Sequence, residues 1–211
     1  RLQKFAKIGR DQRCGTCREC VNPKSKKACL TVRAQQLREL EQQETAERVA
    51  AELERLKQGE AALERVLSGA LDAEGRFSEA QHAPMVARHM RGLSIDQRQG
   101  LVAQGVLLAV LEDSAGTPAG LPFLKAFLGA EGLTVLVRWL RQARDSDNTG
   151  LTEKILRLIE RLPVSLELLL SSKAGKVVKQ LQKVSPHPAV KKSCGALIKT
   201  WKGIVHTSVK S

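Results

Sequence analysis

Aromatic residues are scarce in this sequence. They make up 3% of the 211 residues, and tyrosine is missing altogether. An aromatic-rich β-sandwich, or a sheet that stacks nucleic-acid bases, is therefore not expected. Long hydrophobic runs are missing as well, since none approaches the roughly 18 apolar residues that a membrane-spanning helix needs. We expect no membrane partner.

Motifs of enzymes are also missing. The sequence contains no GxxxxGK[ST], GxGxxG or HExxH motif. Cys194 lies on the apolar stripe of a predicted helix, where a cysteine packs as a small hydrophobe, and this leaves no nucleophile–base pair. We expect no catalysis and no small-molecule substrate. The chain starts at Arg1 and not at a methionine, so these absences concern this stretch of sequence only.

Helix-forming residues dominate what is present. Leu, Ala, Glu, Gln, Lys and Arg are abundant, and no segment alternates apolar and polar residues with the period of a strand. We therefore predict an all-α fold, namely a helical bundle of short helices with a long N-terminal helix and a small four-cysteine zinc module.

Charge is unevenly distributed along the chain. The formal net charge of +13 divides into +8 over residues 1–33, −5 over 34–79, +1 over 80–170 and +9 over 171–211. The last segment holds nine lysines and no acidic residue. Two separated basic regions indicate contacts with an anionic partner.

Four of the five cysteines lie close together in the sequence, with the spacing C-x2-C-x2-C-x8-C. Four thiolates at this spacing can close a tetrahedral zinc shell, and a closed shell leaves no position for a catalytic water. The alternative, disulfide pairing, needs an oxidising compartment, and no secretion signal is visible. We predict one structural Zn²⁺, and its ligands are Cys14, Cys17, Cys20 and Cys29.

Basic residues surround this cysteine cluster. Four thiolates around Zn²⁺ carry a formal charge of −2, which nearby cations offset. The same cations can contact DNA phosphates. Charge compensation on a solvated surface and DNA binding therefore both remain open. The predicted DNA-binding residues are Arg13, Arg18, Lys24, Lys26 and Lys27.

Residues 10–33 resemble half of a CXXC zinc finger, the chromatin module that binds unmethylated CpG DNA. The similarity lies in the run CGTCRECVNPKSKKAC at 14–29. The family has two such clusters and a KFGG segment before Lys-Lys-Gln, whereas this chain has one cluster, no KFGG, and Ala28 in place of that Gln. The resemblance implies a zinc module that contacts DNA, and CpG selectivity does not follow from it.

A long helix is predicted from Arg33 to Leu71, where the sequence has no proline. Apolar residues recur along it at alternating spacings of three and four, interrupted by Glu60. This seam suits either a spacer that packs on the following helices or a helix that binds a second copy or a partner. Its members are Ala46, Val49, Leu53, Leu56, Leu63 and Leu67.

Shorter helices are expected after this one. Ser78-x-x-Gln81 and Ser94-x-x-Gln97 have the pattern of capping boxes, which open helices to about Gly92 and Asp113. Further helices are predicted at 121–128, 131–144, 151–162, 165–171, 175–184 and 188–206. We divide the chain into a basic zinc module (1–33), an acidic helical linker (34–93) and a helical bundle (94–211).

Residues 95–206 resemble the N-terminal (LW) domain family of the elongation factor TFIIS. The family implies a small non-catalytic bundle that docks short disordered acidic and apolar motifs of transcription regulators. The phosphatase-targeting PNUTS-type members contain a phrase similar to KVVKQL at 176–181. The matching segments are GLTVLVRWL at 132–140, ILRLIERLPVS at 155–165, SKAGKVVKQL at 172–181 and LIKTWK at 197–202.

One cationic helix face is the predicted partner-binding surface, and its residues are Lys173, Lys176, Lys179 and Lys183. The alternative is a solvated face that confers solubility. We expect a nuclear adaptor in chromatin and transcription elongation, whose zinc module contacts DNA and whose bundle docks motifs of elongation or phosphatase-complex proteins. Two other hypotheses are a protein-interaction scaffold without DNA binding, and a clamp in which both basic ends grip phosphates.

Overall fold

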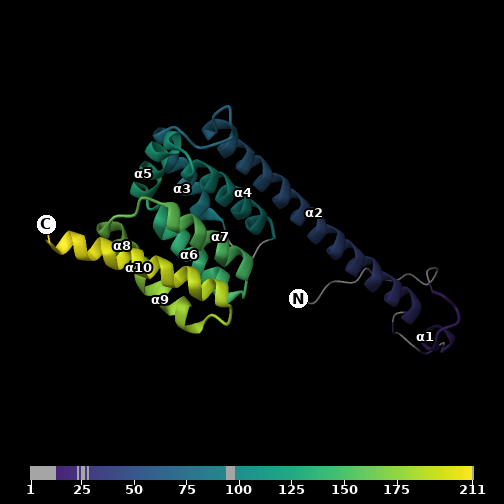
Figure 1. Cartoon of the computed structure of the whole chain (residues 1–211). Coiled ribbons are helices and arrows are strands. Elements are labelled where there is room, and N and C mark those ends of the chain that lie inside the picture. Colours follow the sequence, from purple (N-terminus) through teal and green to yellow (C-terminus); the bar gives the residue numbers. More distant parts are fainter. Residues whose placement is uncertain (1–12, 23, 25–26, 28, 94–97, 211) are drawn as a thin grey trace. The chain divides into compact units, whose positions relative to one another are not determined.

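The structure is a computed structural model that describes residues 13–22, 24, 27, 29–93 and 98–210. The all-α prediction is confirmed: the described residues hold no strand, only an isolated bridge between Leu71 and Phe77. The elements in chain order (Figure 1) are α1 (Arg18–Val21), α2 (Leu30–Ala70), the 3-10 turn η2 (Ala80–His82), α3 (Ala83–Gly92), α4 (Arg98–Ala115), η3 (Pro118–Gly120), α5 (Leu121–Gly129), α6 (Gly132–Asp145), α7 (Thr149–Arg161), α8 (Leu166–Ser172), α9 (Ala174–Val184) and α10 (Pro188–Lys210).

Packing divides the chain into two compact units, Arg1–Gln58 and Gly59–Ser211. The boundaries at 33/34 and 93/94 rest on charge and composition and stay a prediction. In the structure, buried residues between 66 and 90 belong to the same apolar core as those of α6, α7, α9 and α10. The bundle thus begins before residue 94 where packing is the criterion.

The long N-terminal helix is present as α2, and its apolar seam has two different environments. Val66 and Ala70 are buried in the core of the second unit, and Leu63 and Leu67 pack against it. Residues 41–55 are exposed on every face of the helix. The spacer interpretation therefore holds for the last turns of α2, while the seam from Ala46 to Leu53 meets solvent.

The core of the second unit forms where amphipathic helices bring their apolar stripes together. α6 packs against α7, and α10 packs against both α7 and α9. Trp139 and Leu140 on α6 and Ile155 on α7 are fully buried. Apolar residues at three- and four-residue spacing place one stripe of each helix on this core, which is why sequence periodicity locates these helices well.

A hydrogen-bonded corner joins α8 to α9. Ser165 caps α8 by accepting a hydrogen bond from the Leu168 N–H, and Lys173 adopts the left-handed conformation with φ of 56° between the two helices. The Ser172 hydroxyl donates to the Leu168 carbonyl at 2.6 Å and accepts from the Ala174 N–H at 3.3 Å. These bonds satisfy backbone groups that the helix ends leave unpaired, so the corner has a defined geometry.

The prediction of a capping box at Ser78-x-x-Gln81 is wrong. α3 begins at Ala83 after η2, and its N-terminal cap makes no side-chain hydrogen bond. The chain before it is held by tertiary contacts, because the buried Phe77 N–H donates to the Ser114 hydroxyl on α4. The second expected capping box, Ser94-x-x-Gln97, lies outside the described residues. Bounds of the six later helices agree closely with prediction, except that α10 continues to Lys210.

No single helix in the described part of the chain is long and apolar enough to cross a membrane. One bent pair, Pro118–Gly129 with Gly132–Asp145, meets the criteria of length and composition, with 77° between its helices. Both members supply buried residues to the core of the bundle, among them Phe127 and Trp139.

Replacing Trp139 by alanine tests this core. The indole is completely buried, so Trp139→Ala should lower the free energy of unfolding by about 3–5 kcal/mol. Urea unfolding followed by circular dichroism at 222 nm measures the change. Lys154→Ala, at an exposed position of α7, is the control and should change stability by less than about 0.5 kcal/mol. Equal stabilities of the two variants would contradict the position of Trp139 in the core.

Candidate metal centre and docking groove

The four cysteines of the first unit converge from three short segments. Cys17 is the N-terminal cap of α1, Cys20 lies within α1, and Cys29 directly precedes α2. Gly15 has φ of 75°, a conformation that glycine adopts without steric cost. This glycine turns the chain so that Cys14 folds back over α1.

The geometry of the sulfurs fits one metal ion. All four Sγ atoms lie within 4.8 Å of one another. Cys17 Sγ is 3.4 Å from Cys20 Sγ and 3.8 Å from Cys29 Sγ, and Cys14 Sγ is 3.9 Å from Cys20 Sγ. A tetrahedral shell with metal–sulfur bonds of about 2.3 Å has sulfur–sulfur edges of about 3.8 Å. A disulfide would need about 2.05 Å, and all four cysteines are free.

Hydrogen bonds to Cys14 Sγ stabilise the thiolate form of this cysteine. Thr31 and Thr16 hydroxyls donate to Cys14 Sγ at 3.4 and 3.5 Å, and the Cys17 N–H donates at 3.3 Å. These donors, with Thr31 the strongest, lower the pKa of Cys14 to about 5. Burial raises the pKa of Cys20 to about 12. Because metal ligation requires deprotonated thiols, a cation supplies the charge that this second thiol needs in order to ionise.

The basic residues around the cluster divide into two groups. Arg13 is half-buried and donates to the Lys27 carbonyl at 3.2 Å, so it closes the loop between Cys20 and Cys29. Arg18, Lys24 and Lys27 are exposed. Lys26 lies outside the described residues. After α1 the Lys24 N–H donates to Asn22 Oδ1 at 3.0 Å, which holds this part of the loop.

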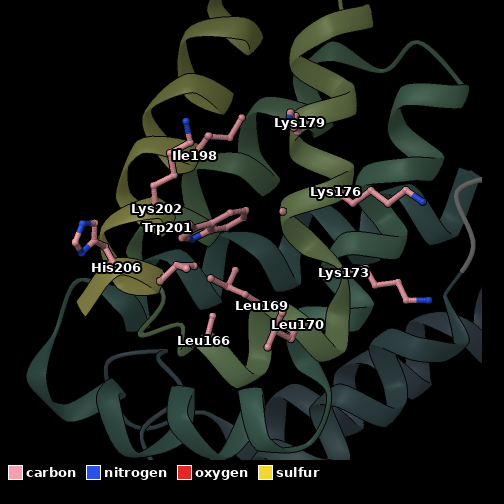
Figure 2. A pocket seen from close by; sticks show the side chains of 12 residues that line it. Leu166, Leu169, Leu170, Lys173, Lys176, Lys179, Ile198, Trp201, Lys202 and His206 are labelled. Carbon is pink, nitrogen blue, oxygen red and sulfur yellow. The ribbon is translucent and has the colours of Figure 1, made fainter. Parts of the chain in front are cut away.

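The second unit carries an apolar groove of about 890 Å³ between α8, α9 and α10. Leu166, Leu169 and Leu170 of α8 form one end of it (Figure 2). Ile198, Trp201 and Val205 of α10 also line it, and the Trp201 indole lies between α10 and α9 in Figure 2. The groove follows from the corner between α8 and α9 described above.

Exposure distinguishes the floor of the groove from its edge. Trp201 and Leu169 are 6% and 8% exposed and belong to the core. Leu170 is 70% exposed and Val205 is 42% exposed. Large apolar side chains gathered at the surface and rimmed by polar groups mark interaction sites, so the edge residues are the part of this groove that a partner can cover.

Lysines line the rim of the groove. Lys173, Lys176 and Lys179 come from the α9 side and Lys202 from α10. Lys173 and Lys176 extend away from Trp201 in Figure 2, which leaves the floor apolar. Lys183 is exposed on α9 but is not among the residues that line the groove. Three of the four predicted partner-binding lysines thus border one concave surface.

Sequence reasoning missed the apolar residues of the groove. Leu168, Leu169 and Leu170 are consecutive, and only Leu169 is buried. Three consecutive residues of a helix cannot all face the core. The run of leucines therefore indicates that at least one large apolar side chain is exposed. Ile198 and Val205 lie on the apolar side of the last helix, where spacing alone favours burial in the core, and both line the groove.

Known proteins resemble part of this chain. Residues 154–205 match the Med26 family, described as a TFIIS helical bundle-like domain. Over 84 residues the chain is 31% identical to "Serine/threonine-protein phosphatase 1 regulatory subunit 10" of Xenopus laevis, and 27% identical to the proteins of that name from Mus musculus and Sus scrofa. Each match takes in 40% of this chain and only about a tenth of the relative's own length. The resemblance of the bundle to the TFIIS domain family and its PNUTS-type members is confirmed.

Exchange of one cysteine tests the metal centre. Cys29→Ser removes one of four ligands, so the tightly bound metal should fall from one equivalent per chain to near zero, measured by mass spectrometry of the metal content after dialysis. Cys194→Ala should keep the full equivalent, because Cys194 is buried in the core of the bundle, where burial raises its pKa to about 11. The thermal unfolding of the bundle should be the same in Cys29→Ser and in the unaltered chain; loss of its cooperative transition would contradict two separate units.

Proposed function

We propose that this chain is a nuclear, non-enzymatic adaptor that acts in chromatin and transcription elongation. Its groove docks short, disordered, acidic and apolar segments of transcription regulators or phosphatase-complex proteins. Its cysteine cluster holds a structural Zn²⁺ and presents cations to DNA. The observation that carries the docking role is the groove itself, where exposed Leu170 and Val205 lie beside a rim of lysines.

Apolar contacts supply most of the affinity in such a site. Burial of one leucine-sized side chain contributes about 1.5–3 kcal/mol, whereas an exposed ion pair contributes about 0–1 kcal/mol. The lysines therefore act mainly on selectivity and association rate, since they attract acidic residues and repel basic ones. In a segment with apolar residues between acidic flanks, the apolar residues can contact the floor of the groove and the acidic residues can pair with the lysines at its rim.

The similar proteins support partners that belong to phosphatase or transcription elongation complexes. The relatives are regulatory subunits of a phosphatase by name, and the matched domain is described by its likeness to TFIIS. Residues 154–205 include α8, α9 and most of α10, which are the elements that form the groove. Partners from phosphatase or elongation complexes, and a location in the nucleus, are our proposals on this basis.

The donor set of the cluster favours zinc. Four cysteine thiolates in tetrahedral array are typical of structural Zn²⁺ sites, which stabilise small modules that have little apolar core of their own. When bound, the ion supplies folding energy and no catalysis, because four protein ligands close its shell. Arg18, Lys24 and Lys27 are exposed at the surface of the module, where they can contact DNA phosphates.

A second candidate function is a protein-interaction scaffold whose zinc module has a structural role only. The observation in its favour is Arg13, whose guanidinium donates to the Lys27 carbonyl inside the module. At least one of the predicted DNA-binding cations thus serves the fold of the module. The DNA experiment below separates the two candidates.

Peptide binding tests the groove. The probe is a fluorescein-labelled synthetic peptide with a Leu-Phe cluster between glutamate flanks. Leu170→Ser should weaken its binding about tenfold, because it removes apolar burial worth at least about 1.4 kcal/mol. Lys176→Gln should weaken binding severalfold and more so at low salt, whereas Lys183→Gln, on the same helix but outside the lining, should have a smaller effect. Fluorescence anisotropy measures each dissociation constant.

Two altered peptides serve as controls for this experiment. One has its glutamates replaced by glutamine, and the other has its Leu-Phe cluster replaced by serine. Each should bind more weakly than the parent peptide. Equal binding of all three peptides, or an unchanged affinity in Leu170→Ser, would overturn the docking role of the groove.

DNA binding tests the zinc module. The zinc-loaded chain is titrated against labelled duplexes with and without CpG steps, at several salt concentrations. The double variant Arg18→Gln/Lys24→Gln should reduce the slope of log K against log salt by about 1.8, at about 0.9 for each lost phosphate contact. Lys57→Gln/Lys125→Gln removes the same charge at exposed positions elsewhere and is the control. A slope unaffected by the first variant would favour the scaffold without DNA contact.

A further inference from the structure

Helix α10 presents three different faces. With about 100° between successive residues, Val190, Cys194, Leu197 and Trp201 share one side, and all four are buried. Ile198 and Val205 occupy the adjacent side and line the groove. A third side lies opposite the core, and its described positions are Lys191, Lys192, Gly195, Lys199, Lys202 and His206.

Lysines dominate this third side. The four on it, Lys191, Lys192, Lys199 and Lys202, are exposed, and we call them the lysine stripe. They lie within an arc of about 100°. No ion pair among the described residues joins any of them to an acidic group, and the sequence from 171 to 211 contains no acidic residue at all.

We propose that the lysine stripe binds the phosphate backbone of duplex DNA. This surface is separate from the zinc module and does not depend on it. It also differs from the peptide-docking role of the groove, because Lys191, Lys192 and Lys199 do not line the groove. Only Lys202 belongs to both surfaces.

The chemistry of the stripe selects this partner among polyanions. An acidic and apolar peptide needs apolar contacts, and on α10 these lie on the groove side. Single-stranded nucleic acid needs aromatic platforms on which bases stack, and the only aromatic ring among the described positions on this side of α10 is His206. An interfacial membrane helix inserts its apolar face, and the apolar face of α10 is buried in the core. Lysines without arginines contact phosphates as point charges and do not favour bidentate recognition of bases.

The dimensions of the stripe suit a duplex backbone. From Lys191 to Lys202 the helix rises about 16 Å. Each strand of a duplex carries one charge per about 3.4 Å along its axis, so about five phosphates of one strand lie within that length. The four lysines can each reach a phosphate with their flexible side chains. We therefore expect binding that depends strongly on salt and only weakly on DNA sequence.

Removal of the lysines that do not line the groove tests the proposal in the full zinc-loaded chain. The variant is Lys191→Gln/Lys192→Gln/Lys199→Gln, and the probe is a labelled mixed-sequence duplex without CpG steps. The slope of log K against log salt should fall by about 2.7, at about 0.9 per contact, and affinity at low salt should fall at least tenfold. The matched control Lys57→Gln/Lys125→Gln/Lys154→Gln loses the same charge at exposed positions elsewhere. Its affinity for the duplex should stay within about threefold of the unaltered chain, and the slope of log K against log salt should stay unchanged.

The same triple exchange in the Arg18→Gln/Lys24→Gln background separates the stripe from the zinc module. An equal decrease in slope in both backgrounds supports an independent contact surface, and disappearance of the decrease overturns it. Equal effects of the stripe and control variants would also overturn the proposal, since net charge alone would then explain binding. Binding to phosphatidylserine vesicles as strong as binding to DNA, with the same dependence on the stripe, would show a general polyanion surface and refute the duplex assignment. Unchanged peptide binding confirms that the variants retain a folded groove.

Discussion

The packing of α10 against α7 and α9 is the contact on which the surfaces of the bundle depend. Val190, Cys194, Leu197 and Trp201 enter the core together, and this fixes the rotation of α10 about its axis. Once that rotation is fixed, Ile198 and Val205 line the groove, where Ile198 still packs against the core and Val205 is 42% exposed. The left-handed corner at Lys173 fixes α8 in the same way, so that Leu169 is buried while Leu170 remains 70% exposed. The groove is thus a consequence of how α8 and α10 pack on the core.

This arrangement concentrates charge as well as apolar surface. Nine lysines fall within residues 171–211 without an acidic neighbour in the sequence, and their mutual repulsion opposes the close approach of α9 and α10. Burial of Val177, Val178 and Leu181 from α9 against α10 and its neighbours offsets that repulsion. Salt screens the repulsion further, because exposed charges beyond about 10 Å interact little at 0.1 M ionic strength. Negative charge beside these lysines reduces the repulsion directly, so we expect an acidic ligand to stabilise the bundle more than a neutral one does.

The sequence predicts those features that depend on spacing alone. The helices from α6 to α10 follow from complete apolar stripes, and the candidate metal centre follows from four cysteines at ligand spacing. The failed capping box shows the limit, because the backbone near Ser78 is held by the bond from Phe77 to Ser114 on α4, a residue 37 positions away. The groove shows the same limit of prediction from the sequence. Three consecutive leucines precede Ser171, and only the tertiary orientation of α8 decides which one is buried. Lys183 has the helical spacing of its neighbours, and the path of α10 leaves it outside the groove.

The absence of acidic residues from α10, residues 188–210, has a single explanation if α10 serves the three surfaces together. A carboxylate on its core side would be buried without a partner, at a cost of several kcal/mol. On the groove side it would repel the acidic flanks of a docked segment, and on the opposite side it would pair with a lysine and remove a phosphate contact. The exposed residues that remain, such as Ala196 and Thr200, are small or neutral and lie between these faces. Because Lys202 belongs to both the groove and the stripe, a peptide and a duplex that bind together must share its charge.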